Sequence, residues 1–403
     1  MQINLKPFKD FFSSGSAGGI LLLLCVIVSL VIANSPLGGE FNFFLQTELG
    51  WENDSVHLRY PILLWINDGL MAIFFLLVGL EIKRELVEGE LSSFKKASLP
   101  VLAAIGGVVV PALIYAVFNH DQPTSAGWAI PMATDIAFAL AIVRVLGKKV
   151  PLGLRIFLAA LAIVDDLMAI LVIAIFYATS LNLLYLGYAL GIFVLLLIFN
   201  KMGIKKIYAY LLPGIFMWYF IHHSGIHATI AGVLVAFTLP TTPGSKKESA
   251  LERLEHMLTK PVNFMIMPLF ALANTNIEFV GGMLEGLTSP LGLGIILGLV
   301  VGKPVGIFIL SWIAIKTGMS QRPTGSDWVT LFGVSMLAGI GFTMSIFISF
   351  LSFSDEFLLS ESKFAILIAS ILAAVGGTVS LNVIYKRRKA RERELKSKLR
   401  END

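Results

Sequence analysis

Apolar runs of about 20 residues follow one another along the chain, separated by short polar segments. Because an α-helix rises about 1.5 Å per residue, such a run crosses a hydrocarbon layer of about 30 Å. The runs are continuous instead of alternating, which favours helices over the strands of a transmembrane barrel. The pattern predicts an all-α polytopic membrane protein with about twelve transmembrane helices, at 13–34, 60–82, 97–118, 126–145, 152–178, 182–200, 206–221, 225–240, 258–275, 290–315, 328–351 and 361–385.

Composition and charge support this prediction. Hydrophobic residues make up 56% of the chain and charged residues 14%, whereas soluble domains are about 25% charged. With the N-terminus inside, all 31 Lys and Arg residues lie on the predicted inner side except Arg59, Lys303 and Lys363. By the positive-inside rule, both termini are therefore expected in the cytoplasm. The net charge of +4 follows from this topology, and no nucleic-acid partner is needed to explain it.

The chain is expected to form a single transmembrane domain. Its parts are an outer loop at 35–59, core helices at 60–386 and a cytoplasmic tail at 387–403. In the outer loop, Phe41–Leu49 and Ser55–Tyr60 could pair as a small hairpin around Asn53 and Asp54. The charged tail is expected to be a surface helix or disordered, and to set the topology rather than bind a partner. The single Cys25 excludes an internal disulfide.

Ionisable side chains occur inside these apolar runs, where one charge costs at least about 2.5–3.5 kcal/mol. Asp165 and Asp166 are adjacent in the middle of one run, and Asp135 and Lys303 lie near the centres of two others. All four are therefore expected near the bilayer midplane. One ion pair would be enough to hold helices together, and here three acids face one base. The cluster favours an ion or proton path, with purely structural pairing as the alternative.

Two of the predicted spans carry helix-breaking residues at the same depth. Pro131 precedes Thr134 and Asp135, and a later span contains Gly339 and Gly341. Interrupted helices expose backbone N–H and C=O groups, which are tolerated in a membrane only where protein or water satisfies them. We expect two broken helices that cross near the midplane, with Asp135 offsetting N-terminal ends and Lys303 offsetting C-terminal ends. A plain proline kink with glycine packing faces is the alternative.

Other ionisable residues lie nearer the two membrane surfaces. Asp68 is about 20 Å from Glu81 along one predicted helix, which places Asp68 in the outer half and Glu81 at the inner mouth. Glu81 and Glu85 are one turn apart and could equally form an ordinary solvated helix end. His227 begins a span at its outer end, where a structural role is the alternative to sensing pH.

Six blocks of the sequence resemble the NhaA-type bacterial Na+/H+ antiporters. They occur in the order found in that family and extend over nearly the whole chain. The resemblance implies inverted repeats made of spans three to five and ten to twelve, with two broken helices crossing at the midplane. It also implies a bacterial inner membrane and a possible homodimer held partly by the outer hairpin. The blocks are Trp65–Glu85, Gly127–Leu140, Ala159–Asp166, Gly225–Gly232, Gly302–Gly306 and Gly339–Ile348.

The same resemblance implies roles for individual residues. Asp166 would be the principal Na+ ligand, with Asp165 and Thr134 beside it, and Lys303 would pair with Asp165. Asp135 would lie at the crossing of the broken helices. Two further groups are implied, an ion path at Asp68 and Gly341 and a pH-response or gating set at Glu81, Glu85, Glu255, His256 and His227.

These residues predict exchange of intracellular Na+ or Li+ for external H+ at a buried carboxylate, without enzyme chemistry or a cofactor. Two carboxylates and Lys303 could carry more than one proton per cycle, which would make exchange electrogenic. Three other classes fit less well. An intramembrane aspartyl protease needs a G-x-G-D motif that the sequence lacks, a midplane lysine opposes a passive cation channel, and a sodium–solute symporter needs a larger polar cavity.

Overall fold

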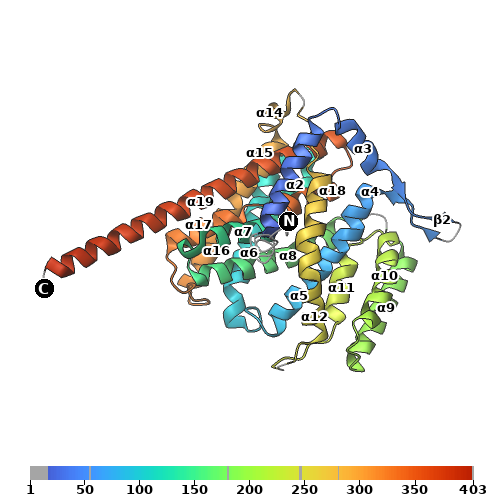
Figure 1. The fold of residues 1–403 in the computed structure, drawn as a ribbon, viewed down its shortest axis with the longest axis horizontal. Helices are drawn as coiled ribbons and strands as arrows, with labels where there is room; N and C mark the ends of the chain where they lie inside the picture. Colours follow the sequence, from blue (N-terminus) through green and yellow to red (C-terminus); the bar gives the residue numbers. More distant parts are fainter. Residues whose placement is uncertain (1–16, 54–55, 179–180, 245–246, 280, 402–403) are drawn as a thin grey trace, which may run out of the picture.

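The computed structural model describes residues 17–53, 56–178, 181–244, 247–279 and 281–401. The N-terminal tail, the first residues of the predicted span 13–34 and the turn residue Asp54 lie outside the described residues. The described chain is mostly helical, with four short strands. Figure 1 shows long helices stacked against one another, with α9 and α10 together at one edge and α19 crossing toward the opposite side.

The helices follow the predicted apolar runs closely. In the first half they are α2 (Ala17–Ala33), α3 (Gly38–Gln46), α4 (Ile62–Leu64), η1 (Trp65–Leu70), α5 (Met71–Val87), α6 (Phe94–Asn119), η2 (Pro123–Met132), α7 (Ile136–Leu146), η3 (Gly147–Lys149) and α8 (Leu152–Phe176). In the second half they are α9 (Leu183–Lys201), α10 (Tyr208–His223), α11 (Ile230–Thr238), α12 (Ala250–Pro261), η4 (Val262–Ile266), α13 (Met267–Asn274), α14 (Met283–Gly286), α15 (Pro290–Leu297), η5 (Gly298–Gly302), α16 (Lys303–Lys316), α17 (Trp328–Ala338), α18 (Phe342–Ser352) and α19 (Glu356–Glu401).

Several of these helices are long and apolar enough to cross a membrane. Within the described ranges there are 7, or up to 9 if each of two bent helix pairs is one span. The chain is thus a multi-pass helical membrane protein. The predicted spans at 206–221, 225–240 and 258–275 match shorter or segmented helices. The helical part of 225–240 covers only Ile230–Thr238, because Gly225 adopts a positive φ of 85° and the chain turns there.

The outer segment is partly helical. We expected Phe41–Leu49 to be a strand, and this is wrong for its first part, because Gly38–Gln46 forms α3 at 110° to α2. The strands are shorter and pair antiparallel: β1 (Glu48–Leu49) with β4 (Tyr60–Pro61), and β2 (Glu52–Asn53) with β3 (Val56–His57). At the other end of the chain, the charged tail continues α19 as one helix, which extends beyond the rest of the molecule (Figure 1).

Both predicted interruptions are present. The span at 126–145 consists of the 3-10 helix η2, an extended segment at 133–135 and then α7. The span at 328–351 consists of α17 and α18, which meet at an angle of 48° around 339–341. The first half of the earlier span is a 3-10 helix where we expected an α-helix. Gly127 is packed so tightly there that a side chain would clash with Tyr115 and Phe353.

The helices α6 and α16 cross in backbone contact. A side chain added at Gly106 would clash with the carbonyl of Gly306, and one added at Gly306 would clash with the carbonyl of Gly106. Small residues at such crossings allow membrane helices to approach closely. Lys303 begins α16, one turn before Gly306. The glycine crossing therefore fixes how deeply the lysine reaches into the molecule.

This crossing predicts the effect of one added methyl group. Gly306→Ala should lower the free energy of unfolding by about 1–3 kcal/mol, because overpacking forces the two backbones apart. Thermal unfolding of the purified protein in detergent measures this. The matched control is Gly187→Ala on α9, where an added Cβ meets nothing within 4 Å. Equal stability of the two variants would contradict the close approach.

Candidate functional site

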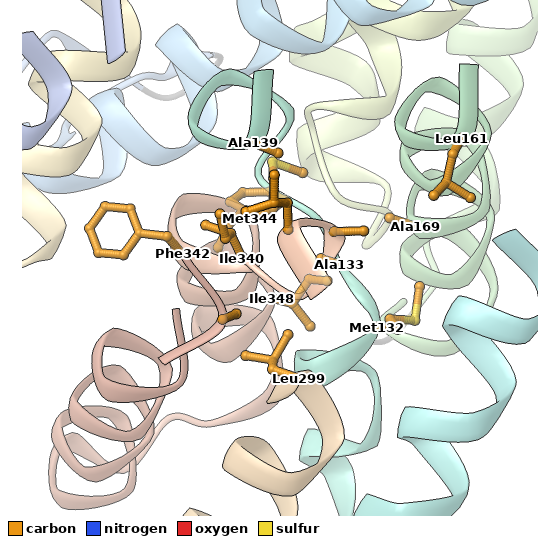
Figure 2. Packing of buried hydrophobic residues seen from close by; sticks show 14 of the residues in the cluster. Met132, Ala133, Ala139, Leu161, Ala169, Leu299, Ile340, Phe342, Met344 and Ile348 are labelled. Atoms are coloured by element: carbon orange, nitrogen blue, oxygen red, sulfur yellow. The ribbon is translucent and has the colours of Figure 1, made fainter. Parts of the chain in front are cut away.

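The two broken helices cross and are hydrogen-bonded to each other. The Asp135 backbone N–H donates to the Ile340 carbonyl at 2.6 Å, and the Thr134 hydroxyl donates to the Ala338 carbonyl at 2.9 Å. The Ser345 hydroxyl adds a bond of 2.8 Å to the Ile130 carbonyl. Each interruption thus satisfies backbone groups that the other leaves unpaired. Figure 2 shows the apolar side chains packed around this crossing, among them Met132, Ala133, Ile340, Leu299 and Met344.

Asp135 caps the N-termini of both broken helices. Its Oδ1 accepts from the Phe138 backbone N–H of α7 at 3.0 Å. Its Oδ2 accepts from the Thr343 backbone N–H of α18 at 3.1 Å, and also from the Thr343 hydroxyl. Asp135 is 1% exposed. A carboxylate at a helix N-terminus offsets the partial positive charge of the helix dipole, and here one side chain serves two helices.

Lys303 stabilises a helix end of the opposite kind, the C-terminal end of η2. Its ammonium donates to the Met132 carbonyl, the last residue of η2, and to Asp165 Oδ2 at 2.6 Å. The Lys303 and Asp165 side chains are each 1% exposed. Thr134 neighbours the Asp165 carboxylate from the first broken helix. The prediction that Lys303 offsets a C-terminal end and pairs with one of the two adjacent aspartates matches this geometry.

Asp166 differs from its neighbour. It is 3% exposed, and within the described part of the chain its side chain makes no hydrogen bond or ion pair. Consecutive helical residues point about 100° apart, so Asp166 turns away from the Lys303–Asp165 pair. It lies within electrostatic range of Asp165, Glu81 and Asp135, and of the one cation Lys303. Asp166 is therefore a buried carboxylate without a protein partner, surrounded mostly by negative charge.

The inner end of α5 carries a second charged group. Arg84 forms ion pairs with Glu85 at 3.4 Å and with Glu255 of α12 at 3.1 Å. Burial raises the pKa of the Glu255 carboxyl above its ordinary value, although the Arg84 guanidinium opposes this. Glu81 is half-buried one turn before Glu85. These glutamates are therefore not the ordinary solvated helix end that we considered as an alternative.

Two further polar contacts lie near the inner end of α5. His256 is exposed and faces Glu248 at 3.4 Å, so the structure does not bring it to Arg84 with Glu255. The Lys83 ammonium donates to the Phe237 and Leu239 carbonyls at 2.7 and 2.6 Å. It thereby satisfies the C-terminal end of α11 and holds that helix against α5.

Asp68 is held between two histidines. Its Oδ2 is 3.2 Å from His222 Nδ1, and its Oδ1 is 3.4 Å from His227 Nε2. His227 also contacts the Thr229 hydroxyl at 2.8 Å from the turn that precedes α11. This group is separate from the Lys303–Asp165 pair. Asp68 lies in the π-helical turn η1, which widens the helix at this point.

Sequence reasoning missed the roles of four buried or paired residues near these groups. His222 was a usable signal, because it lies five residues before His227 at the same predicted end. Arg84 was recognised only as a neighbour of Glu85, and its reach to α12 requires the tertiary packing. The buried amide pair of Asn67 and Asn274, at 2.7 and 3.2 Å, gave no signal, since isolated asparagines are common in membrane helices.

The double cap predicts an unusually large effect for one carboxylate. Asp135→Ala should lower the free energy of unfolding by about 2–4 kcal/mol, because two caps worth about 1–2 kcal/mol each are lost. The matched control is Asn182→Ala, which removes the cap of α9 alone, from an exposed side chain. Thermal unfolding in detergent compares the two. An equal loss of stability in both variants would refute the double cap.

Comparison with known proteins places nearly the whole chain in one group. The family model described as Na+/H+ antiporter 1 matches residues 9–381. The chain is 64% identical over 385 residues to Na+/H+ antiporter NhaA 2 of Flavobacterium johnsoniae, covering 95% of this chain and 94% of that protein. It is 49% identical over 379 residues to Na+/H+ antiporter NhaA of Flavobacterium psychrophilum (94% and 96% covered). It is also 49% identical over 382 residues to Na+/H+ antiporter NhaA 1 of Clostridium beijerinckii (94% and 96%).

Proposed function

The chain belongs to the Na+/H+ antiporter 1 family, and on that premise we propose that it exchanges intracellular Na+ or Li+ for external H+ at Asp166. Membership of an antiporter family makes it a transporter and not an enzyme, as its sequence predicts. Exchange is driven by the ion gradients themselves and needs no cofactor. The physiological result is Na+ extrusion and control of internal pH at the bacterial inner membrane.

The observation that carries this proposal is the state of Asp166. A carboxylate taken out of water must bind a proton or a cation, because an uncompensated charge is costly there. Asp165 already has Lys303, and Asp135 already has two helix ends. Asp166 is thus the group left to bind either ion in turn. Na+ would bind Asp166 with oxygen atoms of Asp165 and Thr134 as further ligands.

The Lys303–Asp165 pair supplies a second titratable element. When Na+ binds beside Asp165, its positive charge weakens the hold of the carboxylate on the Lys303 ammonium. Loss of a proton from Lys303 would then accompany Na+ entry, together with the proton from Asp166. Two protons exchanged for one Na+ would make transport electrogenic. Support for this step is the short contact of 2.6 Å between the two side chains in a site with 1% exposure on each.

The ion path is proposed to run from Glu81 at the inner mouth, past Gly341 in the second broken helix, to Asp68 at the outer end. Twelve spans, cytoplasmic termini and inverted repeats over α6–α8 and α15–α19 belong to the same proposal. The matched pair of interruptions in η2–α7 and α17–α18 supports the repeats. A homodimer joined through the outer strands is compatible with the exposure of β1 and β2.

The pH response is proposed to reside at the inner charged group, which consists of Arg84, Glu81, Glu85 and Glu255. His256 would act through the net charge of the adjoining loop. His227 would act at the outer end. Because burial raises the pKa of Glu255, this carboxyl is neutral at low pH and becomes charged at a higher pH than an exposed glutamate. Its ion pair with Arg84 is fully formed only above that pKa. Alkaline activation would follow from completing this pair between α5 and α12.

Removal of the Asp166 charge tests the transport site. The measurement uses inverted membrane vesicles with a fluorescent ΔpH reporter, in which respiration acidifies the lumen. Added Na+ or Li+ should dissipate this pH gradient, more strongly at alkaline pH. Added K+ should not dissipate it. Asp166→Asn should abolish this response because the exchangeable proton site is gone. Asp327→Asn, outside the site, should keep it. A normal Na+ response in Asp166→Asn would reject Asp166 as the exchange site. No response in the unaltered protein would favour a sodium–solute symporter.

A second substitution tests the pH response. Glu255→Gln fixes this side chain in its neutral form, so its ion pair with Arg84 cannot form at any pH and the rise of exchange toward alkaline pH should be largely lost. The control is Glu88→Gln, an exposed carboxyl on the same side of the molecule. The same vesicle measurement is made over a pH series. An activation profile that coincides with that of the control would remove Glu255 from the pH response.

A further inference from the structure

A basic hollow lies between the end of α7 and the C-terminal part of α19. It has a volume of about 230 Å³, and the cations that line it are Lys148, Lys149, Arg388 and Lys389. A second hollow of about 350 Å³ shares Lys149 and Lys389 with it. Together we call them the basic hollow. It lies at the proposed cytoplasmic side, near the part of α19 that extends past the other helices in Figure 1.

The positive charge of the basic hollow is mostly uncompensated. Arg388 is paired with Asp327 at 2.6 Å. Lys148, Lys149 and Lys389 have no ion-pair partner in the described ranges, and the residues lining the two volumes include no Asp or Glu. Several ammonium groups drawn from η3 and α19 thus face one space. Such an arrangement attracts an anion with several oxygen atoms.

An apolar groove of about 480 Å³ lies next to the same two helices. It is formed between α2, α7 and α19, and its lining includes Val145 and Leu146, the residues just before η3. On α19 it is lined by Ala374 and Thr378, and two to three turns further along the same face Tyr385 lines the basic hollow. At about 100° per residue these α19 positions share one side of the helix. The groove therefore leads toward the lysines.

We propose that the apolar groove and the basic hollow together bind one anionic phospholipid of the cytoplasmic leaflet. The phosphate group would lie among Lys148, Lys149 and Lys389, and an acyl chain would lie along α7 and α19. A soluble anion would use the hollow alone, whereas a lipid uses both volumes. Tyr385 lines the basic hollow, and an aromatic ring with one polar atom is a side chain typical of membrane interfaces.

The bound lipid would pack against the two broken helices, which carry residues of the proposed transport site. The groove is also lined by Ile340 and Phe342, which flank the interruption between α17 and α18. It is lined by Phe138 of α7, whose backbone N–H is capped by Asp135. An acyl chain here would pack against both broken helices from the lipid side. This is a binding site distinct from the ion path.

Native mass spectrometry of the delipidated full-length protein tests the proposal. Phosphatidylglycerol and phosphatidylcholine with identical acyl chains are titrated separately. The unaltered protein should bind phosphatidylglycerol in preference. The triple variant Lys148→Gln/Lys149→Gln/Lys389→Gln should lose one tightly bound phosphatidylglycerol, with affinity at that site lowered at least about tenfold. The control, Lys201→Gln/Lys260→Gln/Lys316→Gln, removes three exposed lysines that line neither volume and should keep it.

A second variant separates lipid from free anion. Ala374→Phe fills the groove and leaves the lysines in place, so it should also weaken phosphatidylglycerol binding. Equal phosphatidylglycerol binding by the lysine triple variant and its control would overturn the proposal. Glycerol phosphate competing as tightly as phosphatidylglycerol would overturn it too, since the hollow would then be a site for a soluble anion. Unchanged binding in Ala374→Phe would also overturn it.

Discussion

Four helix ends meet in the middle of the molecule, and their backbone groups cannot be left unpaired at that depth. Asp135 satisfies two N-terminal ends, and Lys303 satisfies one C-terminal end while holding Asp165. Remaining groups are satisfied where the two interruptions bond to each other, as at Thr134 and Ala338. The interruption of the helices is what creates a polar space within an apolar protein. The charged side chains make that interruption stable.

The same arrangement determines which group is available for ions. Asp135 and Asp165 are occupied by partners, so their negative charges are already offset by the fold. Asp166 follows Asp165 on α8 and points elsewhere, without a partner in the described structure. Asp165 therefore serves both the fold, through Lys303, and the proposed Na+ site, whereas Asp166 serves the proposed site alone. Three acids and one base therefore leave one carboxylate unpaired in this small buried volume. An equal number of acids and bases would leave none.

Much of this site could be predicted from the sequence, because charge in an apolar run is such a strong signal. Spacing and electrostatics predict the interruptions at Pro131 and Gly339–Gly341 and the convergence of Asp135, Asp165 and Lys303. They also predict the assignment of opposite helix ends to Asp135 and Lys303. The helix α3 was missed, since Gly38–Gln46 carries aromatic residues that also suit a strand. The bridge from Arg84 to Glu255, and the pairing of His222 with Asp68, depend on how distant helices pack, which no local pattern encodes.

The central claim is that Na+ displaces a proton from Asp166 within the fold held by Asp135 and Lys303. The most direct test counts protons without transport. Purified protein in weakly buffered detergent solution at alkaline pH is titrated with NaCl and, separately, with choline chloride, while a pH electrode records release and calorimetry records binding. The account predicts release of at least about one proton per bound Na+, none with choline, and none in Asp166→Asn. Saturable Na+ binding to the unaltered protein with no proton released would contradict it.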